Sequence, residues 1–176
     1  MPPQIIFPVH LALGYVACLL CFGTYALPRL KSMDRMEAQR VIATVHSFRF
    51  FGLVFILPGV VGPNLPAAFA HFAAYGDFTT GILALLALLT VRLRPLFWSF
   101  VVAFNLVGTV DLILAYYNAI KGGLPEVAGQ LGAAYVIPII YVPVLMITHC
   151  LALYWLVSPQ PKTALDAHFM KEKNYV

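Results

Sequence analysis

The sequence predicts an all-α integral membrane protein, a five-helix transmembrane bundle with its N-terminus outside and its C-terminus in the cytoplasm. Composition is the first observation: of 176 residues, 61% are apolar and 10% are charged, against about 45–50% and about 25% in soluble domains. The second is a set of five long apolar stretches, with a mean hydropathy of +0.86 overall. The third is a bias of basic residues toward one side of these stretches. So few charged side chains could not cover a soluble globule, so we expect the chain to lie in a bilayer.

Each expected helix is a long apolar run that ends at helix-breaking residues. A membrane-spanning helix needs about 20 mostly apolar residues, and runs of Leu, Ala, Val and Phe without alternation indicate helices rather than barrel strands. The predicted helices cover residues 5–27, 41–60, 66–91, 96–119 and 133–157. They form one domain, residues 1–160, followed by a short cytoplasmic tail, residues 161–176.

Turn-forming residues separate these helices and justify their limits in order. They are Pro28 after the first helix, Gly62-Pro63-Asn64 after the second, which has Pro58 near its end, Arg94-Pro95 after the third, Gly122-Gly123 after the fourth and Ser158-Pro159 after the fifth. The first helix lacks a basic leader and is too long for the apolar region of a signal peptide, so we expect it to be a span.

The positions of the basic residues predict the orientation, because cytoplasmic connections carry an excess of Lys and Arg. Nine basic residues fall on one side: Arg29, Lys31, Arg35, Arg40, Arg92, Arg94, Lys162, Lys171 and Lys173. The other side has Lys121 alone, and Arg49 lies inside the second helix. We therefore expect a multi-pass protein of the bacterial inner, or cytoplasmic, membrane. The net charge of +4 reflects this topology and does not indicate a nucleic-acid partner.

Three ionisable residues fall inside the predicted spans: Arg49, Asp77 and Asp111. Such residues are costly in a bilayer and by default mark a functional site. At a rise of about 1.5 Å per residue, both aspartates lie about 21–22 Å from the cytoplasmic side and share one layer. Arg49 starts about 12 Å in, and its long side chain can reach either carboxylate. We expect Arg49 to pair with at least one of them, since an unpaired buried charge is expensive; the sequence leaves open which one.

One guanidinium can neutralise only one of the two carboxylates. The second carboxyl group is the reason to expect proton-transfer chemistry here. The second carboxyl is expected to be protonated at neutral pH, and a neutral carboxylic acid beside an ionised one suits proton transfer. The hypothesis assigns Asp77 and Asp111 as acid and base, with Arg49 holding one of them ionised. The alternative is an ion pair that only fixes helix packing.

Six further polar residues are candidates for holding a substrate or relaying protons. His46 and Arg49 share one face of the second helix. On the fourth helix, Asn118 shares a face with Asp111, whereas Asn105 lies about 120° away. Abundant aromatic residues and a proline-bent fifth helix are typical of a pocket for an apolar molecule, and equally of ordinary packing between membrane helices. The candidate substrate-binding residues are His46, His149, Asn105, Asn118, Tyr116 and Tyr141.

These features favour a membrane-embedded enzyme or binding protein for a small lipophilic molecule. The alternatives are a proton-coupled small transporter or channel, a haem-binding membrane protein, and an accessory subunit of a membrane complex. The partners are then the lipid bilayer and the lipophilic molecule, with a homo-oligomer or a membrane complex left open. No cofactor is firmly implied; a haem or metal would use His46 and His149, or His10 with His71. Cys18 and Cys21 form a C-x-x-C pair deep in the first helix, where they are expected to pack as small apolar side chains.

Overall fold

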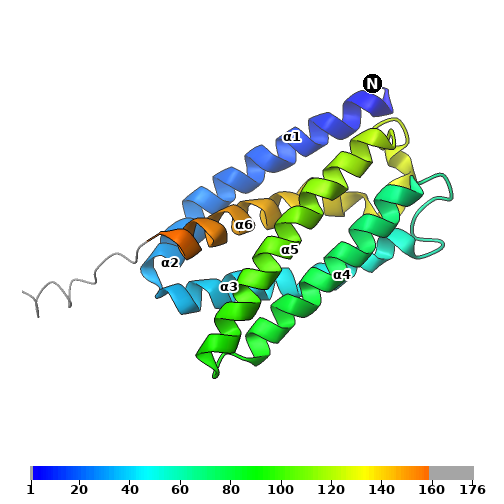
Figure 1. Ribbon diagram of the computed structural model, residues 1–176. Helices are drawn as coiled ribbons and strands as arrows, with labels where there is room; N and C mark the ends of the chain where they lie inside the picture. Colours follow the sequence, from blue (N-terminus) through cyan, green and yellow to red (C-terminus); the bar gives the residue numbers. More distant parts are fainter. Residues whose placement is uncertain (1, 159–176) are drawn as a thin grey trace, which may run out of the picture.

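A computed structural model describes residues 2–158, and all regular structure in that part of the chain is helical. The helices form one elongated bundle (Figure 1). The first unit is a continuous rod in which α1 (Pro3–Cys21) passes through a π-helical turn, η1 (Phe22–Ala26), into α2 (Leu27–Ser32). The predicted tail, residues 161–176, lies outside the described residues.

The second predicted helix is built from two kinds of helix. The α-helical part, α3 (Arg35–Ser47), begins at Asp34, whose carboxylate accepts hydrogen bonds from the backbone N–H groups of the first turn. The chain then tightens into a 3-10 helix, η2 (Phe48–Ile56), which begins one residue before Arg49. A 3-10 segment this long is uncommon and often marks a functional region.

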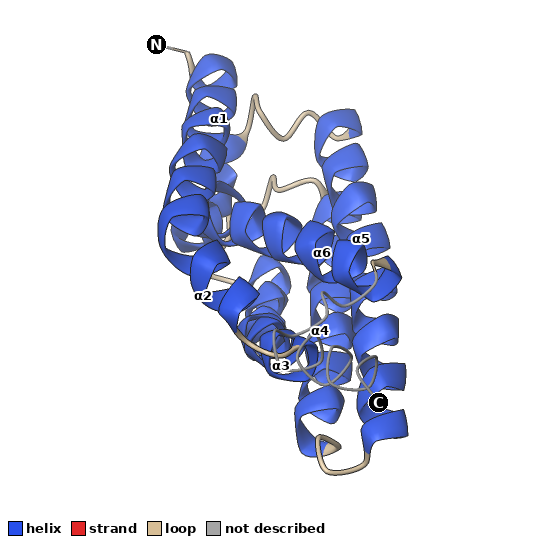
Figure 2. Cartoon of the chain, turned by 90° about the vertical axis from the view of Figure 1, so that its left-hand side faces the viewer, coloured by secondary structure: helices blue, strands red, loops and turns tan. Residues whose placement is uncertain are grey.

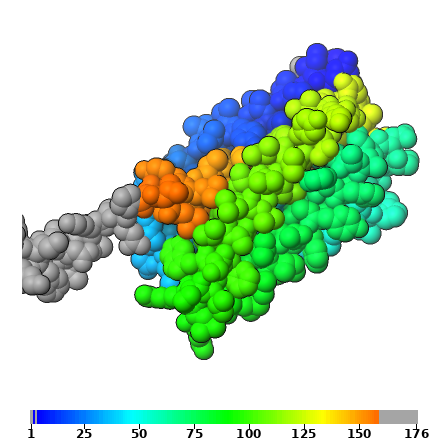
Figure 3. Space-filling model, viewed as in Figure 1, coloured from blue at the N-terminus to red at the C-terminus, as the bar shows by residue number. Residues whose placement is uncertain are grey.

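Two long antiparallel helices form a hairpin, α4 (Ala67–Leu89) and α5 (Arg94–Lys121), that covers one long face of the molecule (Figures 1 and 3). The inner face of α4 carries small residues, which let neighbouring helices approach closely. Those buried there are Ala70, Ala73, Ala74, Gly81, Ala84 and Ala87. As a result α4 packs along both α5 and η2.

The last unit reaches its straight segment through two irregular turns. A 3-10 segment, η3 (Ala128–Tyr135), is followed by a π-helical turn, η4 (Ile137–Tyr141), and then by α6 (Val142–Val157). Pro138 and Pro143 fall in and just after the π-helical turn, as expected where prolines interrupt regular hydrogen bonding. In the bundle, α6 runs between α1 and α5 and contacts both (Figure 2).

Within residues 2–158, four helices are long and apolar enough to cross a membrane: Gln4–Ser32, Ala67–Leu89, Arg94–Lys121 and Ile137–Val157. Large apolar side chains point outward along them, including Leu106, Val110 and Ile113 on α5. Several polar and charged side chains of the same helices are instead buried, among them Asp77, Asn105 and Asp111. This arrangement is the reverse of a soluble domain and is typical of a membrane protein.

The buried core has two apolar parts with a polar layer between them. One apolar part includes Phe55, Phe69 and Ala119. The other includes Ile42, Ala84 and Phe104. Along α4 and α5 the buried polar residues fall between these two groups, at Asp77, Thr80, Asn105 and Asp111. The site described next is this layer.

Candidate functional site

Arg49 is fully buried and binds both of the buried aspartates, Asp77 and Asp111. Its Nε donates a 2.6 Å hydrogen bond to Oδ1 of Asp77, and its Nη2 donates one of 2.6 Å to Oδ2 of Asp111. The prediction that Arg49 pairs with at least one aspartate is confirmed, and the pairing includes both. One side chain thus ties η2 to α4 and α5 through two short charge-assisted bonds.

The third nitrogen of the guanidinium determines which nitrogen of the His149 imidazole carries the proton. Nη1 of Arg49 lies 3.0 Å from Nε2 of His149, and arginine can only donate, so this ring nitrogen accepts. The proton of the imidazole is therefore on Nδ1, which donates to Oδ1 of Asn105 at 2.9 Å. The amide of Asn105 in turn donates to the carbonyl of Val101 at 2.8 Å. His149 is thus a neutral imidazole that orients Arg49. We refer to Arg49, Asp77, Asp111, His149 and Asn105 as the Arg49 cluster.

His46 forms a second layer behind His149. The two rings lie 4.0 Å apart, centroid to centroid, and both residues are fully buried. Nε2 of His46 lies 3.0 Å from the hydroxyl of Thr148, which itself donates to the carbonyl of Val144. The histidine nitrogen is then the donor, and its Nδ1 has no hydrogen-bond partner within residues 2–158.

One carboxylate oxygen of the cluster is also unpartnered. Oδ1 of Asp111 is buried and receives no hydrogen bond from the described part of the chain. It lies against Gly76 of α4, where any side chain would overlap it. Similarly, a Cβ at Gly108 would stand 2.5 Å from both Nη1 of Arg49 and Nε2 of His149. These two glycines make the space that the cluster occupies.

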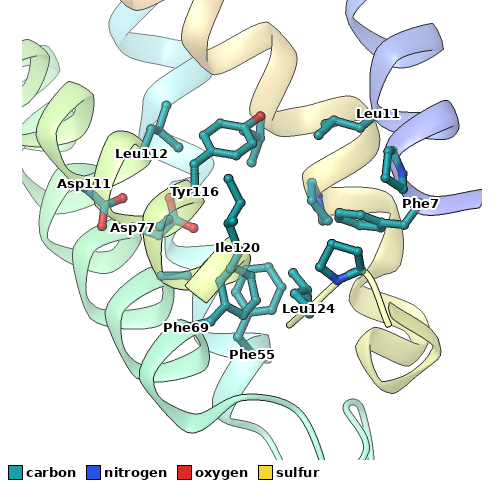
Figure 4. A pocket seen from close by; sticks show the side chains of 17 residues that line it. Phe7, Leu11, Phe55, Phe69, Asp77, Asp111, Leu112, Tyr116, Ile120 and Leu124 are labelled. Carbon is teal, nitrogen blue, oxygen red and sulfur yellow. The ribbon is translucent and has the colours of Figure 1, made fainter. Parts of the chain in front are cut away.

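A cavity of about 270 Å³ adjoins the cluster (Figure 4). The side chains of Asp77 and Asp111 line one side of it, and Phe7 and Leu11 of α1 line the opposite side. Nearly all of the remaining lining is apolar or aromatic and comes from η2, α4, α5, η4, α6 and the turn after α5. The lining includes Phe55, Phe69, Leu112, Ala115, Tyr116 and Leu124. The two carboxyl groups therefore border an apolar chamber that can admit a small molecule.

The six polar residues that the sequence singles out have different surroundings. His149 and Asn105 belong to the cluster, and His46 stacks on it. Tyr116 lines the cavity and shares a 2.8 Å hydrogen bond with the hydroxyl of Tyr15 on α1. Two others lie elsewhere: the hydroxyl of Tyr141 donates to a backbone carbonyl of α3, and the amide of Asn118 donates to its own helix.

The helix face on which each asparagine of α5 lies does not decide which of them joins the cluster. Asn118 shares the helix face of Asp111 but lies two turns away and turns back on the carbonyl of Leu114. Asn105 points to another side of α5 and still joins the cluster, because Arg49 and His149 lie over Gly108 and bridge the two faces. Helix periodicity alone does not reveal such a bridge, which depends on a neighbouring helix.

The histidine pairs do not present a ready haem or metal site. His46 and His149 are in direct ring contact, and both nitrogens of His149 are used in hydrogen bonds. His10 bonds the hydroxyl of Tyr135, whereas His71 packs near Tyr75. No group of three or more His, Cys, Asp or Glu residues within the described range could hold a metal ion. Cys18, Cys21 and Cys150 are free thiols.

The cluster and the helices that build it fall within one family match. Residues 6–157 match the model of a family described as "Domain of unknown function (DUF8737)". The chain belongs to this family. The match reaches from α1 to the last residue of α6 and includes every member of the Arg49 cluster. Among curated proteins and among solved structures, nothing matches the chain.

Proposed function

We propose that this protein lies in a membrane, binds a small lipophilic molecule in the cavity beside the Arg49 cluster, and exchanges a proton with it. One observation carries this proposal: the carboxyl groups of Asp77 and Asp111, held by a single arginine, border a cavity whose other walls are almost wholly apolar. An ion pair needed only for packing would not require a chamber beside it. A chamber with a few convergent polar groups is instead the usual form of a small-molecule site.

The proposal includes five membrane crossings, with the second formed by α3 and η2 together. The 13 residues of α3 and 9 residues of η2 extend about 20 Å and about 18 Å at the rises of α- and 3-10 helices. Their sum exceeds the hydrocarbon thickness of about 30 Å. With five crossings the termini lie on opposite sides. The bias of basic residues supports a proposed orientation with the N-terminus outside and the C-terminus in the cytoplasm, and we propose a bacterial inner membrane as the location.

The carboxyl pair supplies the acid–base function in this proposal. Arg49 contributes one positive charge to two carboxyl groups, so one of them carries a proton at rest. Asp111 is the proton donor, because its Oδ1 has no donor within the described chain, and Asp77 remains ionised beside Nε of Arg49. The neutral His149 holds the guanidinium in place without adding a second charge.

Photolabelling in proteoliposomes tests whether the cavity is occupied. A small neutral aryl diazirine should label Leu112 and Leu124, which are buried and line the cavity. Such residues cannot be reached from the lipid, so their labelling, mapped by peptide mass spectrometry, reports entry into the cavity.

Two variants of α5 complete the test. Ala115→Phe fills the cavity and should abolish labelling at both leucines. Ile113→Phe adds the same ring on the outer face, where Ile113 is exposed and lines none of the cavities described, and should leave the labelling intact. Labelling restricted to outward-facing residues in the unmodified protein would refute the proposed site.

A further inference from the structure

The cavity beside the Arg49 cluster presents carboxylates but no cation. Asp77 and Asp111 line it, whereas Arg49 does not. The guanidinium is turned away and is occupied by bonds to Asp77, Asp111, His149 and the carbonyl of Gly108. Among the described residues, no lysine or other arginine lines this chamber. At rest, a molecule in the cavity therefore meets the carboxylate of Asp77 and the protonated carboxyl of Asp111, and no cationic side chain of the described residues.

The aromatic lining adds to the preference for a positive group. Phe7, Phe55, Phe69 and Tyr116 all contribute to the cavity. Aromatic faces attract ammonium groups, and the attraction is largest where water is excluded. The same rings provide the apolar surface that the body of a lipophilic molecule needs.

The cavity volume limits the size of the ligand. A volume of about 270 Å³ is close to the lower end of the range for ligand pockets, about 300–1,000 Å³. A short chain carrying a ring suits a cavity of this size.

We infer that the ligand is a small lipophilic amine, which enters from the bilayer and is held as an ammonium ion against the carboxyl pair. This inference rests on the proposed function and names its ligand class. The step balances: the O–H bond of protonated Asp111 breaks, and the lone pair of the neutral amine takes the proton to form an N–H bond. The products are a carboxylate and an ammonium ion. The carboxylates of Asp77 and Asp111 then balance the guanidinium of Arg49 and the ammonium group of the ligand.

Few other charged or titratable groups surround this step. Asp111 meets Asp77 from α4 and Arg49 from η2 and lies five residues from Tyr116 on its own helix. Behind Arg49 stand His149 of α6 and His46 of α3, and Tyr15 of α1 bonds Tyr116. Because Arg49 bonds to His149 and the two histidines stack, protonation of either ring would place a second positive charge beside the guanidinium. The carboxyl groups of Asp77 and Asp111 are thus the groups that neutralise the positive charge of the ligand.

The test uses three probes of matched size with the protein in phosphatidylcholine nanodiscs: 4-phenylbutylamine, 4-phenyl-1-butanol and 4-phenylbutyrate. Binding is measured by calorimetry, with empty nanodiscs as the reference for partitioning. The amine should bind about tenfold more tightly than the alcohol, which corresponds to about 1.4 kcal/mol, because a hydrogen bond to a charged group is stronger than one between neutral groups. The acid should not bind.

Variants separate the amine inference from the proposed site. Asp111→Asn should remove the advantage of the amine, whereas Glu37→Gln, which removes an exposed carboxylate on α3, should retain it. Equal binding of amine and alcohol in the unmodified protein would overturn the inference and leave the proposed lipophilic site standing. If no probe binds above empty nanodiscs, the inference fails, and labelling of Leu112 and Leu124 still decides the proposed function. Should Asp111→Asn not fold, the three probes on the unmodified protein remain decisive.

Discussion

Arg49 holds the middle of this molecule together through three nitrogens that bond three different helices. Nε and Nη2 bind the carboxylates of α4 and α5, and Nη1 contacts His149 of α6. Buried charges of this kind are costly to leave unpaired. Arg49, which holds the two carboxyl groups of the proposed chemistry, is therefore also the residue whose loss the fold should tolerate least.

Replacing Arg49 by Met should lower the free energy of unfolding by about 3–5 kcal/mol, because two buried carboxyl groups lose their cation. Arg49→Lys should recover part of this loss, since lysine keeps the charge but cannot bond three partners. The measurement is reversible unfolding in mixed micelles. The triple variant Arg49→Met, Asp77→Asn, Asp111→Asn serves as the control and should be more stable than Arg49→Met alone. A single variant as stable as the unmodified protein would show that the pairs contribute nothing.

Gly76 provides the room for the unpartnered oxygen of Asp111. Gly76→Ala should lower the free energy of unfolding by about 1–3 kcal/mol through overlap, although alanine favours helix more than glycine does. The matched control is Gly23→Ala in η1, where a Cβ meets nothing within 4 Å and a gain of less than about 1 kcal/mol is expected. In an Asp111→Ala background the cost of Gly76→Ala should disappear. Equal effects at the two glycines would contradict this packing.

At the scale of elements, apolar length predicts α4 and α5 well, and it fails to predict the form of the second helix. The predicted ranges 66–91 and 96–119 are close to Ala67–Leu89 and Arg94–Lys121. The range 41–60, in contrast, starts inside α3 and runs through η2. Hydrophobicity is nearly the same in α- and 3-10 helices, so composition carries no signal for the change at Phe48.

In the site, too, some features can be predicted from a single helix, whereas others depend on how neighbouring helices pack against it. The shared depth of Asp77 and Asp111 follows from the helical rise, and so does the reach of Arg49 to both. The link from Asn105 through His149 to Arg49 depends on how α6 is placed against α5, which no local pattern contains. Gly76 likewise has no signal of its own in the sequence, because its role is to be small opposite another helix.

At the scale of the whole molecule, the proposal requires α3 and η2 to cross the bilayer. Met33 and Asn64 flank this crossing and are exposed, so they should lie on opposite sides of the membrane. In a variant with Cys18, Cys21 and Cys150 replaced by Ala, an impermeant maleimide should label Asn64→Cys in intact cells. It should label Met33→Cys only after the cells are permeabilised. Labelling of both positions from the same side would show that this segment does not cross.

One carboxyl group beside Arg49 should carry a proton at neutral pH and give it to the ligand. Infrared spectroscopy of the purified protein in nanodiscs tests this directly, because a protonated carboxyl has a C=O stretch that a carboxylate lacks. We expect one such band, sensitive to exchange into D₂O, that is absent from Asp111→Asn and disappears when 4-phenylbutylamine is added. A spectrum of the unmodified protein without a protonated carboxyl would mean that both aspartates are ionised at rest, and it would contradict the proposed proton transfer.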